Sequence, residues 1–252
     1  MIKLIIFLAA FVAQQVYCDE PERIVGGDIA TAGQFKYQVS LQSYDEHICG
    51  GSIISNTHIL TAAHCVDDDF YTENMVVVSG INNLATKHGV KHDIKCIRKH
   101  PNYTGEKESG WKDDIAVITL KNPIEVNDVQ GPISLASIDH VSGDKRGIVS
   151  GWGKTKISGP TSIMLRWLSV NVLSQERCLR GHKNPRTNEN QICTLEKVGK
   201  GACQGDSGGP LVVDNELVGV VSWVLPCALG ISDVYTNVYR YVDFIKESQS
   251  MC

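Results

Sequence analysis

The chain has 252 residues, of which 42% are hydrophobic and 21% charged, enough to bury a sizeable core in one domain or in two small ones. Its 24 basic and 28 acidic side chains give a formal net charge of -4. No segment concentrates basic residues, and no repeat or heptad pattern is present, which argues against a nucleic-acid-binding face or a coiled coil.

The longest apolar run lies at the N-terminus, from Leu4 to Val12, just after Lys3. It is too short to span a bilayer and has the order of a secretory signal, residues 1–18, which we expect to be cleaved after Cys18. Residues 19–23 would then form a short activation propeptide, and residues 24–252 the mature domain. Export predicts a secreted, extracellular protein in an oxidising compartment, where cysteines form disulfides.

Short segments rich in Val and Ile, separated by Gly, Asn, Asp and Pro, predict strands along the rest of the chain. Those singled out are Tyr37–Gln42, Met75–Ser79, Asp93–Arg98, Ile115–Leu120, Gly147–Trp152, Leu165–Val172, Pro210–Val213, Leu217–Trp223 and Asp233–Thr236. Only the end of the chain, about residues 239–249, has helical spacing. Many short strands without alternating helices predict an all-β sandwich or barrel, with residues 126–142 as the best linker between two halves.

One short segment, Gly205-Asp-Ser-Gly-Gly-Pro210, surrounds a serine with glycines. Glycine permits a tight turn, so backbone N–H groups there can approach a reacting carbonyl. The pattern Gly-x-Ser-x-Gly also marks the α/β-hydrolases, in which an acidic residue and then a histidine follow the serine. No histidine follows Ser207, which excludes that fold.

Three other segments are ambiguous when taken singly. A histidine on an apolar stretch is often a core residue, and an acidic pair before an apolar run is an ordinary strand start. These segments are Leu60-Thr-Ala-Ala-His-Cys65, Asp113-Asp-Ile-Ala-Val-Ile-Thr-Leu120 and Arg23-Ile-Val-Gly-Gly27.

In combination, and with Trp152 between two glycines and the run Val221-Ser-Trp223, the four segments resemble the chymotrypsin-like serine endopeptidases, the family of trypsins, chymotrypsins and elastases. The resemblance runs from Arg23 to about residue 248 and is strongest to invertebrate chymotrypsins with three disulfides. It implies a secreted enzyme that hydrolyses peptide bonds through an acyl-enzyme.

The implied fold consists of two six-stranded antiparallel β-barrels with the active site in the cleft between them. The first barrel would cover about residues 24–130, the second about residues 131–238, and a C-terminal helix about residues 239–249.

The resemblance also implies roles for individual residues. A serine hydroxyl is a poor nucleophile at neutral pH, so Ser207 needs His64 as a base and Asp114 to orient the imidazole. We prefer Asp114 to its neighbour Asp113 because it directly precedes the apolar run. The oxyanion hole would consist of the backbone N–H groups of Gly205 and Ser207.

The bond between Arg23 and Ile24 resembles the activation site of the family. Its cleavage, by a separate trypsin-like protease, would free the amine of Ile24 to pair with the buried carboxylate of Asp206. Because a single buried charge without its partner costs about 3–5 kcal/mol, this pair would act as a latch that orders the serine loop.

By resemblance, three disulfides are expected: Cys49–Cys65, Cys178–Cys193 and Cys203–Cys227. A fourth, Cys96–Cys252, is our hypothesis for the remaining pair. The loop Ile81–Lys91 carries no carboxylate, so we expect no calcium site, and no other metal or cofactor. Asn102 begins a glycosylation sequon.

The substrate pocket would be lined by Gly201, Ser222, Trp223, Val224 and Asp233. Trypsins carry an aspartate six residues before the nucleophile, where this chain has Gly201, and Val224 should narrow the pocket. Two interpretations remain open for Asp233: it replaces the missing charge and admits Lys or Arg, or it is hydrogen-bonded or hydrated while the pocket takes apolar residues. We favour a chymotrypsin- or elastase-like preference for medium apolar residues.

The expected partners are polypeptide substrates, the activating protease and protein protease inhibitors, with neither nucleic acid nor a membrane, and the chain is expected to be a monomer. A minimal propeptide and no separate regulatory module favour digestion over a regulatory or venom role. A different class is a catalytically silent homologue that acts as a binding protein. Such proteins typically lose a catalytic residue or the activation site, and this chain has both.

Overall fold

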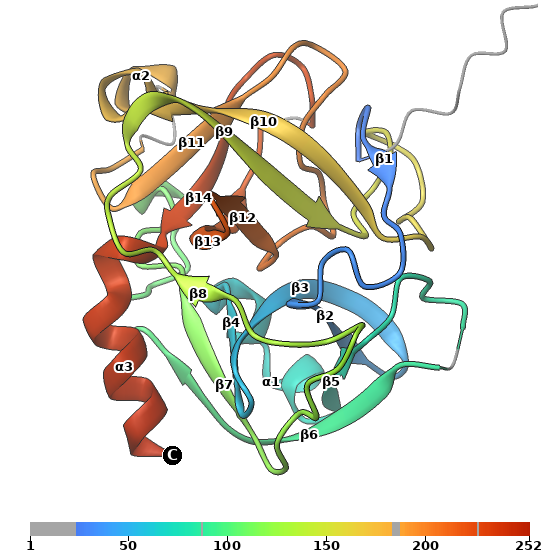
Figure 1. Ribbon diagram of the computed structural model, residues 1–252. Coiled ribbons are helices and arrows are strands. Elements are labelled where there is room, and N and C mark those ends of the chain that lie inside the picture. The colour runs from blue at the N-terminus through green and yellow to red at the C-terminus, as the bar shows by residue number, and fades with distance from the viewer. Residues whose placement is uncertain (1–23, 87, 183–186, 226) are drawn as a thin grey trace, which may run out of the picture.

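The computed structural model describes residues 24–252 except 87, 183–186 and 226 (Figure 1). The predicted signal and propeptide therefore lie outside the described residues. Among the helices that are described, none is both long and apolar enough to cross a bilayer.

The first barrel is a closed antiparallel sheet in the order β2-β3-β4-β7-β6-β5. Its strands are β2 (Gln38–Ser43), β3 (Glu46–Ser55), β4 (His58–Thr61), β5 (Met75–Ser79), β6 (Val90–Lys99) and β7 (Ala116–Leu120). Alternate side chains, such as Val39 and Leu41 of β2, are fully buried in its core. Closure gives every strand a neighbour on each side, which removes exposed sheet edges.

The second barrel runs in the order β10-β11-β14-β13-β12-β9 and is closed by pairing of β9 with β10. Its strands are β9 (Ser142–Gly151), β10 (Arg166–Ser174), β11 (Gln191–Leu195), β12 (Pro210–Val213), β13 (Glu216–Trp223) and β14 (Asp233–Asn237). The short β8 (Ser134–Leu135) pairs in parallel with β13. The predicted fold of two six-stranded antiparallel barrels is confirmed, and Figure 1 shows them one above the other.

The first described residues belong to the second barrel, although the sequence assigned them to the first. The strand β1 (Asp28–Ile29) pairs with the start of β10. Ile24 is fully buried in the core of the second barrel, among side chains such as Val149 and Leu211. Burial of this apolar side chain is favourable, and it holds the start of the domain against the second barrel.

The described helices are few and short apart from the last one. They are η1 (Ala63–Val66), α1 (Asp69–Thr72), η2 (Lys107–Ser109), α2 (Gln175–Gly181), η3 (Val238–Tyr241) and α3 (Val242–Met251), where η marks a 3-10 helix. The predicted C-terminal helix thus begins as a 3-10 turn and becomes α-helical at Val242. Ile245 of α3 is fully buried in the core of the first barrel, so the chain ends against the first barrel.

Four disulfides join all eight cysteines of residues 24–252. They are Cys49–Cys65, Cys96–Cys252, Cys178–Cys193 and Cys203–Cys227. The first links β3 to η1, and the last links the serine loop to the segment after β13. Cys96–Cys252 ties the end of α3 to β6, so it anchors the C-terminus on the first barrel.

Candidate active site

Strand pairing in the first barrel brings His64 and Asp114 to the same place. The register of β4 and β7 places Thr61 opposite Ala116. His64 follows Thr61 by three residues, and Asp114 precedes Ala116 by two, so in an antiparallel pair both leave the barrel at the same end. Two residues that are 50 positions apart in sequence thereby become neighbours.

Asp114 holds His64 by two hydrogen bonds. The His64 Nδ1 and Asp114 Oδ2 atoms are 2.8 Å apart, and the His64 backbone N–H donates to Asp114 Oδ1 at 2.9 Å. Burial lowers the pKa of the His64 imidazole, but the charge and hydrogen bond of Asp114, helped by Asp67, outweigh it and leave the pKa raised. The carboxylate therefore fixes the ring, leaves Nε2 as the outward nitrogen and favours the protonated imidazolium.

The second barrel completes the surroundings of Asp114, which is fully buried. The Ser222 hydroxyl of β13 donates to Asp114 Oδ2 at 2.6 Å, and the Thr236 hydroxyl of β14 donates to the Asp114 backbone carbonyl at 2.7 Å. Sequence reasoning assigned Ser222 only to the substrate pocket and missed its contact with Asp114. Both barrels thus hold this one carboxylate.

Asp113, the adjacent alternative, points elsewhere. Its backbone has a φ of 58°, in the left-handed region, and its Oδ1 accepts a hydrogen bond from the Tyr241 hydroxyl at 2.6 Å. That contact attaches the start of β7 to η3. The structure therefore separates two neighbouring carboxylates, one toward His64 and the other toward the C-terminal segment.

Ser207 lies on a loop that both barrels hold through its backbone. The Gly50 N–H of the first barrel donates to the Ser207 carbonyl at 2.7 Å, and the Gly208 N–H donates to the Val221 carbonyl of β13 at 2.8 Å. Gly208 has a φ of 75°, and a Cβ there would overlap the Thr61 hydroxyl and the Gly50 carbonyl. Only glycine fits this close approach.

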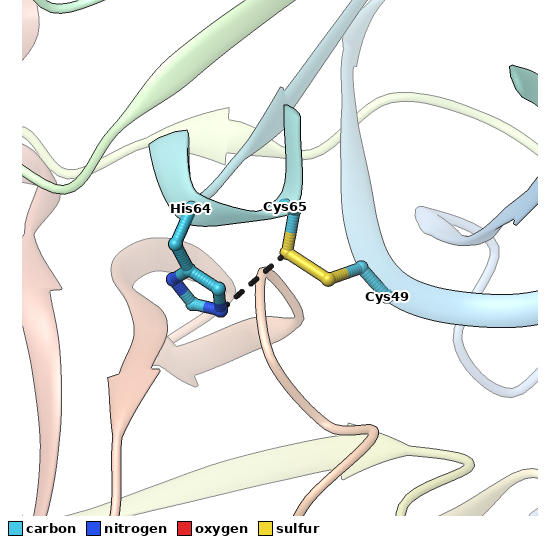
Figure 2. A group of neighbouring side chains, drawn as sticks. All are labelled: Cys49, His64 and Cys65. Carbon is cyan, nitrogen blue, oxygen red and sulfur yellow. Dashed lines mark hydrogen bonds between the residues drawn. A yellow bond between two sulfur atoms is a disulfide. The ribbon is translucent and has the colours of Figure 1, made fainter. Parts of the chain in front are cut away.

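The Ser207 side chain is partly buried and makes no hydrogen bond to His64 or to any other described residue. The His64 Nε2 atom instead lies 3.7 Å from Cys65 Sγ (Figure 2). Hydrogen bonds between a nucleophile and its base are often long in enzymes without substrate. His64, Cys49 and Cys65 have the side chains of a zinc site, but the two sulfur atoms are bonded to each other and so offer no thiolate.

The backbone N–H groups of Gly205 and Ser207 donate to no acceptor among the described residues. The Gly205 carbonyl, in contrast, accepts a hydrogen bond from His47 Nε2 at 2.9 Å, and His47 Nδ1 lies 2.8 Å from the Ser40 hydroxyl. Burial lowers the pKa of His47, which favours the neutral ring. Sequence reasoning missed His47 and Ser40, because nothing in the first barrel's strand pattern indicates a contact with a loop 158 residues away.

Asp206 is fully buried beside the serine. Its two carboxylate oxygens accept hydrogen bonds from the backbone N–H groups of Gly153, at 2.7 Å, and Cys203, at 2.9 Å. Burial raises the pKa of Asp206 to about 6, although these two hydrogen bonds oppose the rise. A Cβ at Gly151 or Gly153 would overlap this carboxylate, which explains the two glycines around Trp152.

The other predicted pocket residues lie on or just after β13, on β14 and in the loop before Ser207. The Asp233 carboxylate lies against Gly201, where a Cβ would come within 2.8 Å of Oδ2. Val224 packs against Cys203 and Cys227. The indole N–H of Trp223, the last residue of β13, donates to the Gly110 carbonyl at 3.1 Å and so orients the Trp223 ring.

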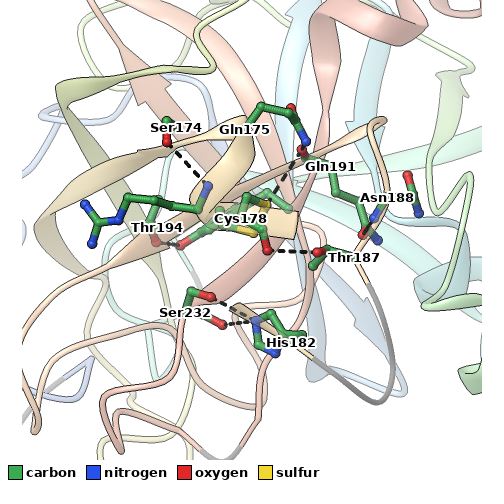
Figure 3. Close-up of a disulfide and its surroundings, with 12 residues drawn as sticks. Ser174, Gln175, Cys178, His182, Thr187, Asn188, Gln191, Thr194 and Ser232 are labelled. Carbon is green, nitrogen blue, oxygen red and sulfur yellow. Dashed lines mark hydrogen bonds between the residues drawn. A yellow bond between two sulfur atoms is a disulfide. The ribbon is translucent and has the colours of Figure 1, made fainter. Parts of the chain in front are cut away.

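The Cys178–Cys193 disulfide joins α2 to β11 at the edge of this region (Figure 3). Beyond α2, the ring nitrogen Nε2 of His182 lies 2.9 Å from both the carbonyl and the hydroxyl of Ser232. The His182 ring also packs edge-on against Trp223, at 4.7 Å between ring centroids. Asn102, the sequon residue, is exposed on a loop of the first barrel.

Comparison with known proteins decides the family. The family model described as Trypsin matches residues 24–245. The chain belongs to the trypsin family. It is 34% identical over 226 residues to Chymotrypsin-2 of Vespa crabro, which covers 90% of this chain and all of that protein. It is 36% identical to Coagulation factor IX of Cavia porcellus, over 90% of this chain and 81% of that protein.

A solved structure agrees with these matches. Neuropsin, described as a serine protease expressed in the limbic system of mouse brain, aligns with a TM-score of 0.81 at 30% identity, covering 89% of this chain and 99% of that one. This trypsin-family chain is a serine-type endopeptidase with the fold that its sequence predicted.

Proposed function

We propose that this trypsin-family enzyme is secreted as a zymogen, is activated by cleavage after Arg23 and hydrolyses peptide bonds through Ser207, His64 and Asp114. The observation that carries the proposal is the buried Asp114 carboxylate, which accepts hydrogen bonds from the His64 ring, the His64 backbone and Ser222. A carboxylate held from two barrels against one imidazole is the arrangement that a serine nucleophile requires of its base.

In the first half-reaction, Ser207 Oγ attacks the carbonyl carbon of the scissile bond while His64 Nε2 takes the hydroxyl proton. The N–H groups of Gly205 and Ser207 donate to the oxyanion that forms. When the carbon–nitrogen bond breaks, His64 returns the proton to the leaving amine, and an ester on Ser207 remains.

In the second half-reaction, water attacks the ester carbonyl and gives a proton to His64. Collapse of the second tetrahedral intermediate releases the carboxylic acid product, and Ser207 recovers its proton. Asp114 remains ionised throughout and stabilises the imidazolium at each step.

Replacing Gly205 by Ala tests the oxyanion hole. Gly205 has a φ of 96°, and a Cβ there would lie 3.1 Å from the Cα of Gly153, so alanine displaces the N–H that the oxyanion needs. We expect kcat to fall about 10²–10³-fold, the cost of one lost oxyanion donor. The matched control is Gly199→Ala, at a φ of 83° with no atom within 4 Å of the added Cβ; its kcat should stay near that of the wild type. Equal kcat in the two variants would remove Gly205 from the oxyanion hole.

Two observations support the activation step. Ile24 is already buried in the core of the second barrel, and Asp206 is a buried carboxylate with only backbone N–H donors among the described residues. An ammonium group created at Ile24 would supply the counter-charge, and the pair would order the loop that carries Gly205 and Ser207.

For P1, the residue before the scissile bond, we propose a preference for medium apolar side chains. The support is the absence of an acidic side chain at Gly201 and the valine at position 224, which takes space beside the Cys203–Cys227 disulfide. Asp233 lies at the base of this pocket, and its role is taken up below. An extracellular location, polypeptide substrates, a trypsin-like activator, protein inhibitors, a monomeric state and a digestive role complete the proposal.

Labelling with a serine-directed fluorophosphonate tests the proposal. After cleavage at Arg23, the wild type should bind the label at Ser207 and cut a peptide panel that varies only at P1, with medium apolar residues cut best. Ser207→Ala should do neither. A correctly cleaved, folded wild type that takes up no label would show that these residues do not work together as proposed.

A further inference from the structure

The substrate pocket proposed above includes a buried carboxylate with few partners, Asp233. Asp233 begins β14 and is 5% exposed. Its Oδ2 accepts a hydrogen bond from the Ala202 N–H at 2.8 Å. Among the described residues, this is the only hydrogen bond of the Asp233 side chain; the Asp233 backbone takes part in the strand pairing of β14. The same oxygen lies against Gly201, which has no side chain; a Cβ there would come within 2.8 Å of it.

Among the residues that the structure describes, those around Asp233 supply no counter-charge. Asp206 adds a second negative charge nearby, and Tyr235 of β14 bonds its hydroxyl to Thr194 at 3.0 Å. Lys200 lies next to Gly201 in the chain, but its side chain packs along Gly26, and no ion pair joins it to Asp233.

The residue that follows α2, His182, is one further titratable group nearby. His182 contacts Ser232, which directly precedes Asp233, and burial lowers the pKa of His182. A neutral His182 adds no positive charge. The remaining candidate is the ammonium of Ile24 after cleavage, which the proposed latch assigns to Asp206.

These surroundings raise the pKa of Asp233. Burial raises the pKa of Asp233 to about 7, the charge of Asp206 adds to the rise, and the Ala202 hydrogen bond opposes it. Pairing of Asp206 with the Ile24 ammonium would cancel one like charge and so lower the pKa of Asp233 from this value. The group would then titrate at neutral to weakly acidic pH.

We propose that the protonation state of Asp233 selects the P1 residue: the protonated acid admits apolar side chains, and the carboxylate admits Lys or Arg. The inference rests on the proposed function and unites the two interpretations of Asp233, which become two states of one residue. An apolar side chain placed against a buried carboxylate would deprive that charge of solvation, whereas an ammonium group would neutralise it.

A competition between two peptides tests the inference. The peptides are identical except that one carries Lys at P1 and the other norleucine, which has the length of lysine without its charge. Cutting both in one tube gives the ratio of their kcat/KM values directly. Titration of His64 affects both peptides equally and cancels from the ratio.

The expected ratio of Lys to norleucine cleavage rises with pH. Below the pKa of Asp233 in the free enzyme, the ionised fraction grows about tenfold per pH unit, and the ratio should follow it before reaching a plateau. Between about pH 5 and about pH 8 we expect a rise of at least about tenfold.

Three variants sharpen the measurement. Asp233→Asn keeps an oxygen that can accept from Ala202 but cannot ionise, so its ratio should be low and independent of pH. Asp214→Asn makes the same chemical change on the surface, where Asp214 pairs with Lys145, and should reproduce the wild-type curve. Ser207→Ala, activated in the same way with bead-bound trypsin, measures any Lys cleavage by residual activator.

The outcomes separate the inference from the proposed function. Cleavage of both peptides in a ratio that does not change with pH would overturn the inference and leave the protease intact. A wild-type curve retained in Asp233→Asn would also overturn it. Failure to cut norleucine at every pH would instead refute the proposed apolar preference, and no cleavage of either peptide by the activated enzyme would refute the proposed function.

Discussion

Two buried aspartates, Asp114 just before β7 and Asp233 at the start of β14, differ in what surrounds them. Asp114 is fully buried and accepts hydrogen bonds from His64 and Ser222. Asp233 is almost as deeply buried but has one loop N–H and a glycine beside it. Burial alone therefore does not determine what an aspartate does; the donors and charges placed around it do.

The largest effect should come from Asp114→Asn. The amide cannot stabilise the imidazolium and favours the wrong tautomer of His64, so kcat should fall about 10⁴-fold, as in the Ser-His-Asp template. Active-site titration followed by steady-state kinetics measures it. Asp113→Asn is the matched control, since Asp113 contacts Tyr241 and not His64. A similar loss in both variants would show that the effect is structural.

Asp206→Asn should have the next largest effect. The amide would leave the Ile24 ammonium buried without a counter-charge, a cost of about 3–5 kcal/mol, and would also lose one of its two backbone donors. We expect kcat/KM to fall about 10²–10³-fold for every P1 residue, unlike the selective change at Asp233. If Asp206→Asn altered only the P1 preference, the assignment of Asp206 to the activation latch and of Asp233 to the pocket would be wrong.

Ser222→Ala should cost less. Removing one hydrogen bond to a charged group is worth about 1.5–3 kcal/mol, so kcat should fall about 10–100-fold. Because the hydroxyl donates to the same oxygen as His64 Nδ1, its loss should also change the apparent pKa of the kcat/KM profile. An unchanged profile and kcat would mean that Ser222 acts only as a wall of the pocket.

The smallest expected effect is the pH dependence of kcat/KM that His64 causes. A general base must be neutral, and Asp114 raises the pKa of His64 above its ordinary value. With a norleucine substrate and Asp233→Asn in both enzymes, so that position 233 does not titrate, kcat/KM should rise with pH through an apparent pKa of His64 above about 6.5. In Asp114→Asn that apparent pKa should fall. Measuring the pH profile of kcat/KM with and without Asp114→Asn, on one neutral substrate, checks the direction of this change in apparent pKa.

Much of the fold was predictable because it follows local patterns. Segments such as Met75–Ser79 and Pro210–Val213 have the Val-rich runs of strands, and the structure forms strands there. The strands β3, β4 and β11 were not singled out: β3 contains two adjacent glycines, β4 begins with a histidine and lacks a Val-rich run, and β11 mixes polar with apolar side chains. Their strand conformation comes from pairing with neighbours, which outweighs weak local propensity.

The sequence by itself determined the family, the order of His64, Asp114 and Ser207, and an even number of cysteines after the predicted signal. These are properties of residue types and their spacing. The tertiary structure decided which barrel takes Ile24, that Ser222 supports Asp114, that His47 contacts Gly205, and that Asp233 faces Gly201. All four contacts join residues more than 30 positions apart, across barrels or loops, so they depend on strand register and close packing, which no local pattern encodes.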